Sequence, residues 1–238
     1  MNDRTALVTG ANKGIGKHIA RLLVAEGFTV YVGARDAGRG QRAVEEIGAG
    51  ARPLVLDVTD PDGIAKAATQ VDRLDVLVNN AGVALSLAPP AEAGVEEFRR
   101  TYETNVFGVV AVTNAFLPAL RRSPHPRIVN VSSGTASLAW STNPNPQFTP
   151  GSGRAAAYRS SKAALNALTV LYAQTLAEEG FKVNALAPGA RATDLTPGAA
   201  AVGGDPAEAA HGALRLALLP DDGPTGGFFS WDATPVPW

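Results

Sequence analysis

The sequence predicts an α/β protein with a doubly wound, mostly parallel seven-stranded sheet and helices on both faces. Two observations carry this prediction. Short apolar segments of buried-strand type alternate along the chain with segments whose apolar residues recur every three or four positions, as in amphipathic helices. The first strand-like segment also runs directly into a glycine-rich turn at 10–16, after which a helical pattern begins. We expect residues 1–238 to form a single domain.

Seven strands are expected, each separated from the next by a turn or a helical segment. The expected strands are 5–9, 28–34, 52–58, 75–82, 127–133, 181–187 and 226–231. The main helical segments are 15–26, a helix starting at Asp60-Pro61, 92–122, a helix through Tyr158 that ends near Gly180, and 205–219. Asparagine is unfavourable inside a helix, so Asn105 indicates either a surface position or a break in the third of these segments. The stretch 140–154 is rich in Pro, Asn, Ser and Gly and is expected to be an irregular insertion over the site.

Composition limits the function classes that need to be considered. Lys and Arg total 21 against 22 Asp and Glu, so no excess of positive charge favours nucleic acid or an anionic membrane as partner. The chain has no cysteine, and its three histidines are far apart in sequence, so no metal site is expected. No apolar segment is long enough to span a membrane. We therefore expect a cytoplasmic protein.

The glycine turn predicts a Rossmann-type nucleotide site. Gly10, Gly14 and Gly16 follow the first strand and open the first helix. Glycines allow a tight turn and let a pyrophosphate approach the helix N-terminus, where free N–H groups favour negative charge. The spacing is Gly-x-x-x-Gly-x-Gly rather than the commoner Gly-x-Gly-x-x-Gly, so an ordinary glycine-rich turn remains the alternative.

The end of the second strand bears on the choice of dinucleotide. An acidic residue about 20 positions after the glycines holds the ribose hydroxyls of NAD, whereas an arginine accommodates the 2′-phosphate of NADP. Asp36 lies at that distance, but Arg35 is the first side chain beyond the strand. We favour Arg35, with Arg39 and Lys13 converging on the same phosphate. The alternative is that all three are solvated surface cations.

Other strand ends place polar groups at the same edge of the sheet. Asp57 could accept a hydrogen bond from the adenine amino group, or could only terminate its strand. The fourth strand runs into Asn80 and Gly82, and the fifth delivers the Ser133 hydroxyl. Tyr158 and Lys162 lie four residues apart on one helix face. A neighbouring ammonium favours an ionised phenol, so Lys162 is expected to lower the pKa of Tyr158 and make it a general acid.

Taken together, these motifs resemble the short-chain dehydrogenase/reductase superfamily in order and spacing over nearly the whole chain. The features that most resemble its carbonyl reductases, which typically use NADP(H), are residues 12–13, 34–36 and 39–41, the long interval between Ser133 and Tyr158, and the segment 216–220. The resemblance implies cofactor contacts from Gly10, Asn12, Lys13, Gly14, Ile15, Gly16, Arg35, Arg39, Asp57, Val58, Asn80, Ala81, Gly82, Tyr158, Lys162, Pro188, Gly189 and Thr193.

The resemblance also implies an activity, namely NADPH-dependent reduction of a ketone or aldehyde to an alcohol, or the reverse. Tyr158 would pass a proton to the carbonyl oxygen, Ser133 would hydrogen-bond that oxygen, Lys162 would tune Tyr158 and bind the nicotinamide ribose, and Asn105 would hold a relay water. The insertion resembles one that covers an oligomerisation face, which weakly favours a monomer. Alternative functions are a non-catalytic NADP(H)-sensing regulator, which has no need of these four residues together, and a methyltransferase with a similar βα start.

Overall fold

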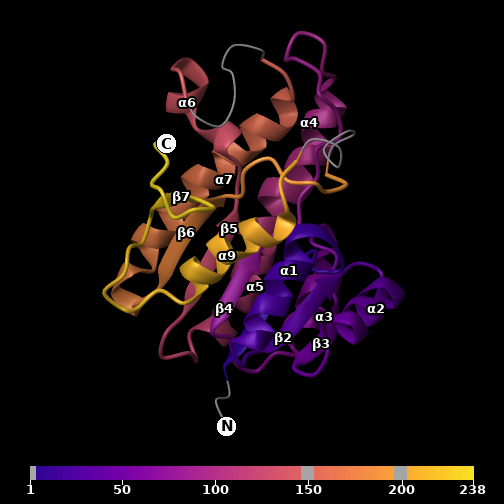
Figure 1. Cartoon of the computed structure of the whole chain (residues 1–238). Coiled ribbons are helices and arrows are strands. Elements are labelled where there is room, and N and C mark those ends of the chain that lie inside the picture. The colour runs from indigo at the N-terminus through magenta and orange to yellow at the C-terminus, as the bar shows by residue number, and fades with distance from the viewer. Residues whose placement is uncertain (1–3, 146–152, 196–202) are drawn as a thin grey trace.

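The computed structural model describes residues 4–145, 153–195 and 203–238. Seven strands form one sheet in the order β3-β2-β1-β4-β5-β6-β7, and every neighbouring pair is parallel (Figure 1). The predicted doubly wound α/β fold is therefore confirmed. The strands are β1 (Thr5–Val8), β2 (Thr29–Ala34), β3 (Ala51–Val55), β4 (Val76–Asn79), β5 (Arg127–Val131), β6 (Lys182–Ala187) and β7 (Phe228–Ser230).

Helices connect successive strands, as right-handed crossovers between parallel strands require. The α-helices are α1 (Gly14–Ala25), α2 (Ala37–Ile47), α3 (Pro61–Ala68), α4 (Val95–Tyr102), α5 (Gly108–Leu120), α6 (Leu138–Thr142), α7 (Ala156–Thr175) and α9 (Pro206–Ala217). Shorter turns are the π-helical η1 (Glu103–Phe107) and the 3₁₀ turns η2 (Gly134–Ala136) and η3 (Ala177–Glu179). No helix in the described ranges is both long and apolar enough to cross a membrane.

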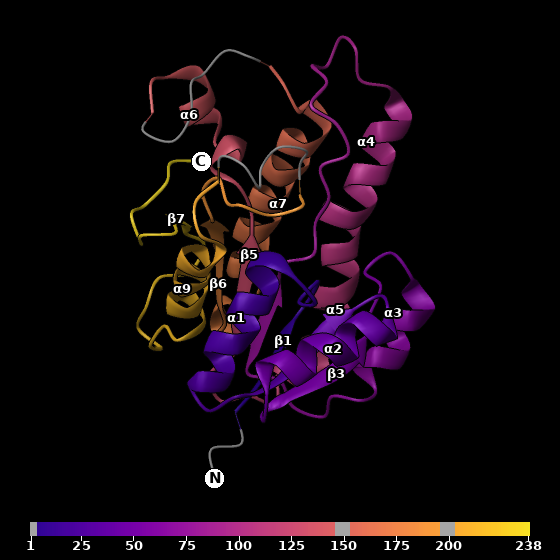
Figure 2. The same cartoon turned by 45° about the vertical axis from the view of Figure 1, so that its right-hand side comes forward.

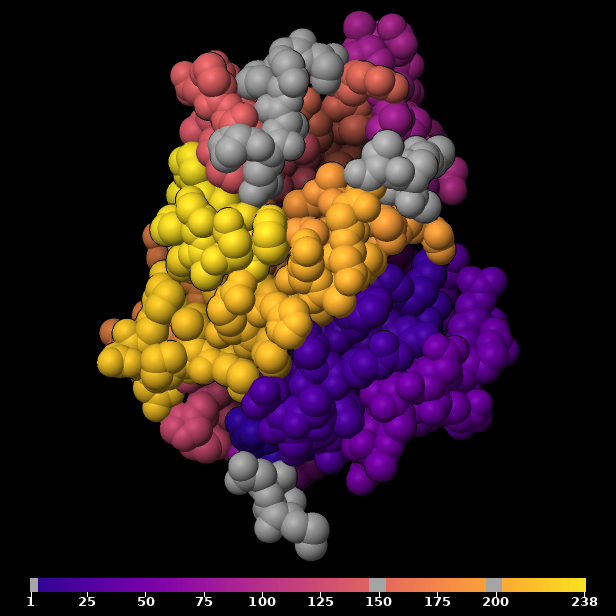
Figure 3. Space-filling view, in the orientation of Figure 1, coloured from indigo at the N-terminus to yellow at the C-terminus, as the bar shows by residue number. Residues whose placement is uncertain are grey.

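Two apolar cores hold the helices to the sheet. Successive residues of a strand point to opposite faces, so Ala6 and Val8 enter the core beneath α1 and α9, whereas Leu7 enters the core beneath α3 and α5. Figures 1 and 2 show α1 and α9 on one side of the sheet, with α5 and α7 on the other. In the space-filling view, α9 and α1 lie side by side across the front of the molecule (Figure 3).

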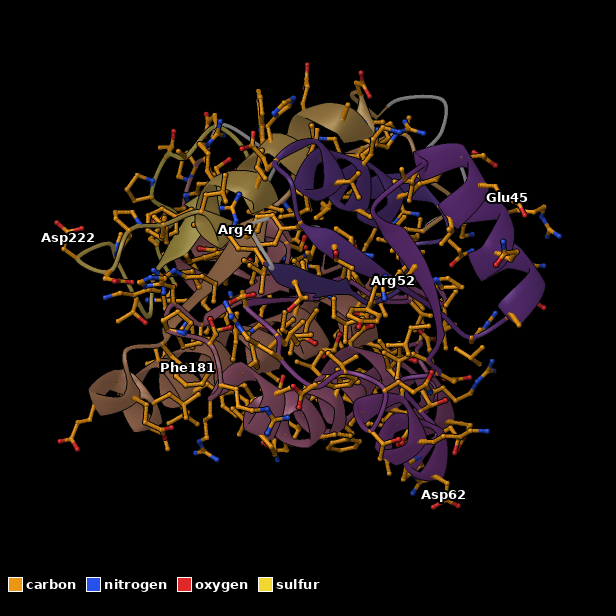
Figure 4. All side chains as sticks on the ribbon, turned by 90° about the horizontal axis from the view of Figure 1, so that it is seen from below. Arg4, Glu45, Arg52, Asp62, Phe181 and Asp222 are labelled. Atoms are coloured by element: carbon orange, nitrogen blue, oxygen red, sulfur yellow. The ribbon has the colours of Figure 1, made fainter. Side chains whose placement is uncertain are left out.

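The end of the sheet seen in Figure 4 is closed by packing and hydrogen bonds. Phe181 is 1% exposed and belongs to the core beneath α3 and α5, and the Arg4 guanidinium lies over the Phe28 ring at 4.3 Å. The Asp75 carboxylate accepts hydrogen bonds from the Thr5 N–H at 2.7 Å and the Ser123 hydroxyl at 2.6 Å. The functional residues predicted from the sequence lie at the opposite end, where the strands finish.

Several elements differ from the sequence-based prediction, and helix α2 was not predicted. The segment predicted as one helix from 92 to 122 is broken by η1, and Asn105 is fully buried within this break rather than on the surface. The segment predicted as irregular after Trp140 begins inside α6, because the Ser137 side chain accepts the Trp140 N–H and caps that helix. Residues 146–152 of the predicted insertion lie outside the described residues. The third strand ends at Val55, three residues earlier than expected.

Candidate active site

A cavity of about 620 Å³ opens at the carboxyl ends of the strands. The residue that immediately follows each of five consecutive strands lines it: Arg35 after β2, Leu56 after β3, Asn80 after β4, Ser132 after β5 and Pro188 after β6. Such a crevice is the usual ligand site of an open α/β sheet. The carboxyl ends of the strands face the upper part of Figure 1, toward the start of α7.

The glycine turn brings bare backbone against the cavity. Gly10 and Gly14 have φ angles of +62° and +55°, which favour glycine, and a methyl group on Gly16 would lie 2.8 Å from the Gly10 carbonyl oxygen. The N-terminus of α1 has no acidic residue in its first turn and no side-chain cap. Its N–H groups are therefore available to an anion, and the turn fits a pyrophosphate.

Thr9 and Asn80 fix the geometry of this turn. The Thr9 hydroxyl accepts hydrogen bonds from the Asn80 N–H at 2.9 Å and the Ala81 N–H at 3.0 Å. The Asn80 side-chain amide donates in return to the Thr9 carbonyl at 2.8 Å. The ends of β1 and β4 are thereby held together beneath the cavity. Thr9 was not predicted to have this role, although its hydroxyl lies directly before the glycine turn in the sequence.

The three predicted phosphate-binding cations all line the cavity, but their surroundings differ. Arg35 and Arg39 are exposed, and the Asp36 carboxylate caps α2 by accepting the Arg39 N–H at 2.7 Å. Lys13 instead pairs with Asp194 at 3.1 Å, across the mouth of the cavity. Asp36 therefore has a local structural role, and the two arginines are exposed cations in the cavity lining beyond β2.

Asp57 and Thr193 both line the cavity, from the segments that follow β3 and β6. One carboxylate oxygen of Asp57 accepts both the Thr59 N–H at 3.0 Å and the Thr59 hydroxyl at 2.8 Å, which closes the turn after β3. This contact matches the strand-terminating alternative considered for Asp57. Thr193 approaches the glycine turn from the segment after β6, with its methyl group 3.5 Å from the position of a Cβ on Gly14.

Helix α7 presents Tyr158 and Lys162 to the cavity, with the Lys162 Nζ 6.0 Å from the centre of the Tyr158 ring. Lys162 is 4% exposed, and its Nζ donates to the Val131 carbonyl at 2.8 Å. Burial lowers the pKa of Lys162 from 10.5 to about 8. Both side chains come from one face of one helix, as their spacing predicts.

The expected effect of Lys162 on Tyr158 is not what the structure shows. Burial raises the pKa of the Tyr158 phenol, and a hydrogen bond with the Ser133 hydroxyl partly opposes this rise. Lys162 makes no comparable contribution in this structure, because its Nζ is directed to the Val131 carbonyl. The prediction that Lys162 lowers the pKa of Tyr158 was therefore wrong for this state. Desolvation of the phenol, which four-residue spacing does not reveal, is the larger effect.

Asn105 lies beneath the lining rather than in it. Its side chain accepts the Val83 N–H and donates to the Val83 carbonyl, both at 2.9 Å, and donates to the Ser161 hydroxyl at 2.9 Å. These bonds fasten the segment after β4 to helix α7. A Cβ on Gly82 would lie 3.3 Å from both the Asn105 Oδ1 and the Lys162 Nζ. A relay water at Asn105 stays a prediction.

Most predicted site residues meet at the cavity. The predicted residues that line it are Gly10, Asn12, Lys13, Gly14, Ile15, Gly16, Arg35, Arg39, Asp57, Val58, Asn80, Ala81, Gly82, Tyr158, Lys162, Pro188 and Thr193. Three others do not: Asn105 and Ser133 lie just behind it, and Gly189 packs against Trp231 and Arg191. Within the described ranges, no three His, Asp or Glu side chains cluster as a metal site would require.

Several lining residues were not predicted from the sequence, and Asp36 was considered there only as the alternative to Arg35. The residues not predicted are Leu56, Thr59, Val83, Ala84, Leu85, Thr104, Val131, Ser132, Ala192, Asp194 and Leu195. Ser132 could have been found, because it is the first residue after β5; its hydroxyl donates to the Asn166 side chain at 2.6 Å. Leu85 and Leu195 gave no signal, because apolar residues in connecting segments match no chemical motif.

Comparisons with known proteins agree with this geometry. Salutaridine reductase from Papaver bracteatum is 34% identical over 95% of this chain and 94% of its own length, and (−)-isopiperitenone reductase from Mentha piperita is 34% identical over 97% of each. The crystal structure of NADPH-bound carbonyl reductase from chicken fatty liver covers 100% of both chains with a TM-score of 0.82 and 27% identity.

The relatives are longer than this chain. The alignment with the Papaver bracteatum enzyme spans 297 residues against 238 here, so that enzyme contains segments without a counterpart in this chain. A sequence model of the short chain dehydrogenase family matches residues 4–201. This match covers most of the chain and includes the glycine turn, the lysine and the tyrosine described above. The protein is therefore a member of the short-chain dehydrogenase family.

Proposed function

We propose that the protein is an NADP(H)-dependent oxidoreductase that reduces a ketone or aldehyde to an alcohol, or carries out the reverse reaction. One observation carries this proposal: Tyr158 and Lys162 line the same cavity as the glycine turn, with Ser133 beside the phenol. A proton donor and an anion-binding turn in one crevice suit the transfer of a hydride and a proton. The family match supports the reaction class.

The described residues fit a dinucleotide. The glycine turn and the uncapped N-terminus of α1 would hold the pyrophosphate, and Arg35 and Arg39 would hold a 2′-phosphate beyond β2. Thr193 and Lys162 would hold the nicotinamide end, where they approach the cavity from different elements. When bound, the nicotinamide supplies or accepts the hydride. The NADPH-bound chicken carbonyl reductase supports this choice of cofactor by analogy.

Side chains of this protein would carry out the proton transfer to the substrate. Burial keeps the Tyr158 phenol protonated at neutral pH, which suits a donor to a carbonyl oxygen. Ser133 would hydrogen-bond the same oxygen as negative charge develops on it. Leu85 and Leu195 are about 40% exposed on two different segments of the lining, so the remainder of the substrate would meet apolar side chains. A neutral carbonyl compound suits this surface.

A cofactor-oxidation screen tests the activity. Reduced nicotinamide absorbance would be followed with NADPH and NADH against aliphatic, aromatic, steroid, quinone and terpenoid carbonyls. Relatives named cyclopentanol dehydrogenase and (+)-neomenthol dehydrogenase make alicyclic ketones and alcohols a useful part of the panel. We expect turnover with NADPH. Binding of NADPH without turnover of any panel member would contradict the proposal and favour the sensor alternative.

Replacing the proton donor tests the mechanism. We expect Tyr158→Phe to lower kcat by about 10²- to 10⁴-fold, the usual value of general acid catalysis, while NADPH binding is retained. Tyr172→Phe is a matched control, because Tyr172 lies on the same helix and its hydroxyl donates to Asn114 at 2.9 Å, outside the cavity. Full activity in Tyr158→Phe would refute the assigned role.

A further inference from the structure

The hydroxyl of Thr135 lies directly beside Ser133. The two side-chain oxygens are 2.8 Å apart, and the Thr135 N–H also donates to the Ser133 hydroxyl oxygen at 3.3 Å. Thr135 belongs to η2, the short turn that follows Ser133. Thr135 does not line the cavity, so any effect on the reaction must pass through Ser133.

The direction of the hydrogen bond between the two hydroxyls follows from the atoms available. A serine hydroxyl has one proton to donate and two lone pairs that accept. The Thr135 N–H already uses Ser133 as an acceptor. The Ser133 hydroxyl also hydrogen-bonds the Tyr158 phenol. Once the phenol is ionised, its oxygen can only accept, so the single Ser133 proton is donated to it. In that state, the proton between the Ser133 and Thr135 oxygens comes from Thr135.

Helix α7, which carries Tyr158, also holds Thr135 in position through Arg159. The Arg159 Nε donates to the Thr135 carbonyl at 3.3 Å, and the Arg159 Nη2 donates to the Ser141 hydroxyl at 2.9 Å. Arg159 follows Tyr158 directly in α7. The helix that carries the phenol therefore also holds the backbone that orients Ser133. A displacement of Thr135 relative to Tyr158 would break this contact.

We propose that Thr135 is a positioning residue whose hydroxyl donates to the Ser133 oxygen and so directs the Ser133 proton toward Tyr158 and the reacting oxygen. This inference rests on the proposed function, because it assumes the roles given there to Ser133 and Tyr158. It adds a residue that contacts neither substrate nor cofactor. Its effect is expected in proton transfer rather than in cofactor affinity.

The first test measures the phenol without any substrate. Tyr158 is replaced by 3,5-difluorotyrosine, whose electron-withdrawing fluorines bring its ionisation into an accessible pH range and separate it from the other three tyrosines in ¹⁹F NMR. We expect Thr135→Val to raise the pH midpoint of this ionisation by roughly half a unit to one unit, the size expected for one weakened hydrogen bond. Thr135→Ser keeps the hydroxyl and should restore the midpoint. Thr135→Ala provides a second removal of the hydroxyl if the valine variant folds poorly.

Two controls separate positioning from a general structural effect. In a Ser133→Ala background, Thr135→Val should no longer move the midpoint, because the residue through which it acts is absent. Thr142→Val removes a nearby hydroxyl that donates only to backbone carbonyls of α6, and should leave the midpoint unchanged. An unchanged midpoint in both Thr135→Val and Thr135→Ala would overturn the proposal. So would an equal shift with and without Ser133.

The second test measures turnover. We expect Thr135→Val to lower kcat by about tenfold with KM changed less than about twofold, and Thr135→Ser to recover most of kcat. The two tests distinguish failure of the proposed function from failure of the positioning role of Thr135. If the wild-type enzyme turns over no carbonyl but the ¹⁹F midpoint moves as expected, the proposed function fails and the positioning of Ser133 stands. If wild-type turnover is robust and the Thr135 variants change neither midpoint nor kcat, only the positioning role is refuted.

Discussion

The buried ammonium of Lys162 should lower the free energy of unfolding of the cofactor-free protein at neutral pH. Its pKa in the folded state is about 8, against 10.5 for an ordinary lysine, and burial is the cause. Between these two values the unfolded chain binds more protons than the folded one, so stability rises with pH across this window and the penalty is fully present below pH 8. The difference of 2.5 units corresponds to about 3 kcal/mol at pH 7.

Lys162→Met should therefore stabilise the cofactor-free protein at neutral pH. The substitution removes the ammonium but also the hydrogen bond from Nζ to the Val131 carbonyl, which is worth about 1 kcal/mol. The net gain is about 2 kcal/mol, or a rise in Tm of roughly 4–8 °C for a chain of this size. If Lys162 holds the nicotinamide ribose as proposed, NADPH binding and turnover should fall in the same variant.

Thermal unfolding of wild type and variant at pH 7 and pH 9.5, without nucleotide, measures this effect. The gain should shrink at the higher pH, where the wild-type lysine is largely neutral. Lys66→Met is a suitable control, since Lys66 is exposed on α3 and its substitution should leave Tm nearly unchanged at both pH values. A Tm at pH 7 below that of wild type, or a gain independent of pH, would refute the reasoning.

Three further outcomes are expected. Arg35→Ala combined with Arg39→Ala should weaken NADPH binding at least about tenfold more than NADH binding in calorimetric titration, and equal losses would mean that these arginines are only surface charge. Gly16→Ala should weaken NADPH binding and lower Tm, because its methyl group would overlap a neighbouring side-chain amide, whereas Gly94→Ala meets no atom within 4 Å and should behave as wild type. Phe116→Ala, at a fully buried position, should lower the urea-unfolding free energy by about 3–5 kcal/mol; a loss under 1 kcal/mol would show that the core collapses into the space.

Local patterns were sufficient for the fold and for most of the lining. The alternation of strands and helices predicts a sheet whose strand ends meet, so Arg35, Asn80 and Pro188 come together because each follows a strand. The glycine turn is equally local, since its backbone conformation depends on glycines within a span of seven residues, 10–16. These features need no knowledge of distant contacts.

What sequence reasoning missed depends on distant packing. The ion pair of Lys13 with Asp194 joins residues 181 positions apart, and neither side chain stands in a motif that predicts the other. The pKa of Tyr158 depends on how completely neighbouring elements exclude water, which a four-residue spacing does not report. Asn105 is a further example. Its polarity predicted either a helix break or a surface position, and the break is present, but its burial against Val83 and Ser161 could not be predicted from the sequence.

The strand order also bears on how the chain folds during synthesis. β4 pairs on one side with β1, in the register Ala6 with Val76, so this half of the sheet is complete once Asn79 has left the ribosome. The other edge of β4 remains unpaired until β5, which begins at Arg127, has been synthesised. At roughly 5–20 residues per second, the nascent sheet carries an open edge for several seconds, which is an opportunity for aggregation or chaperone binding. Translation speed through residues 80–126 should therefore influence the yield of native protein.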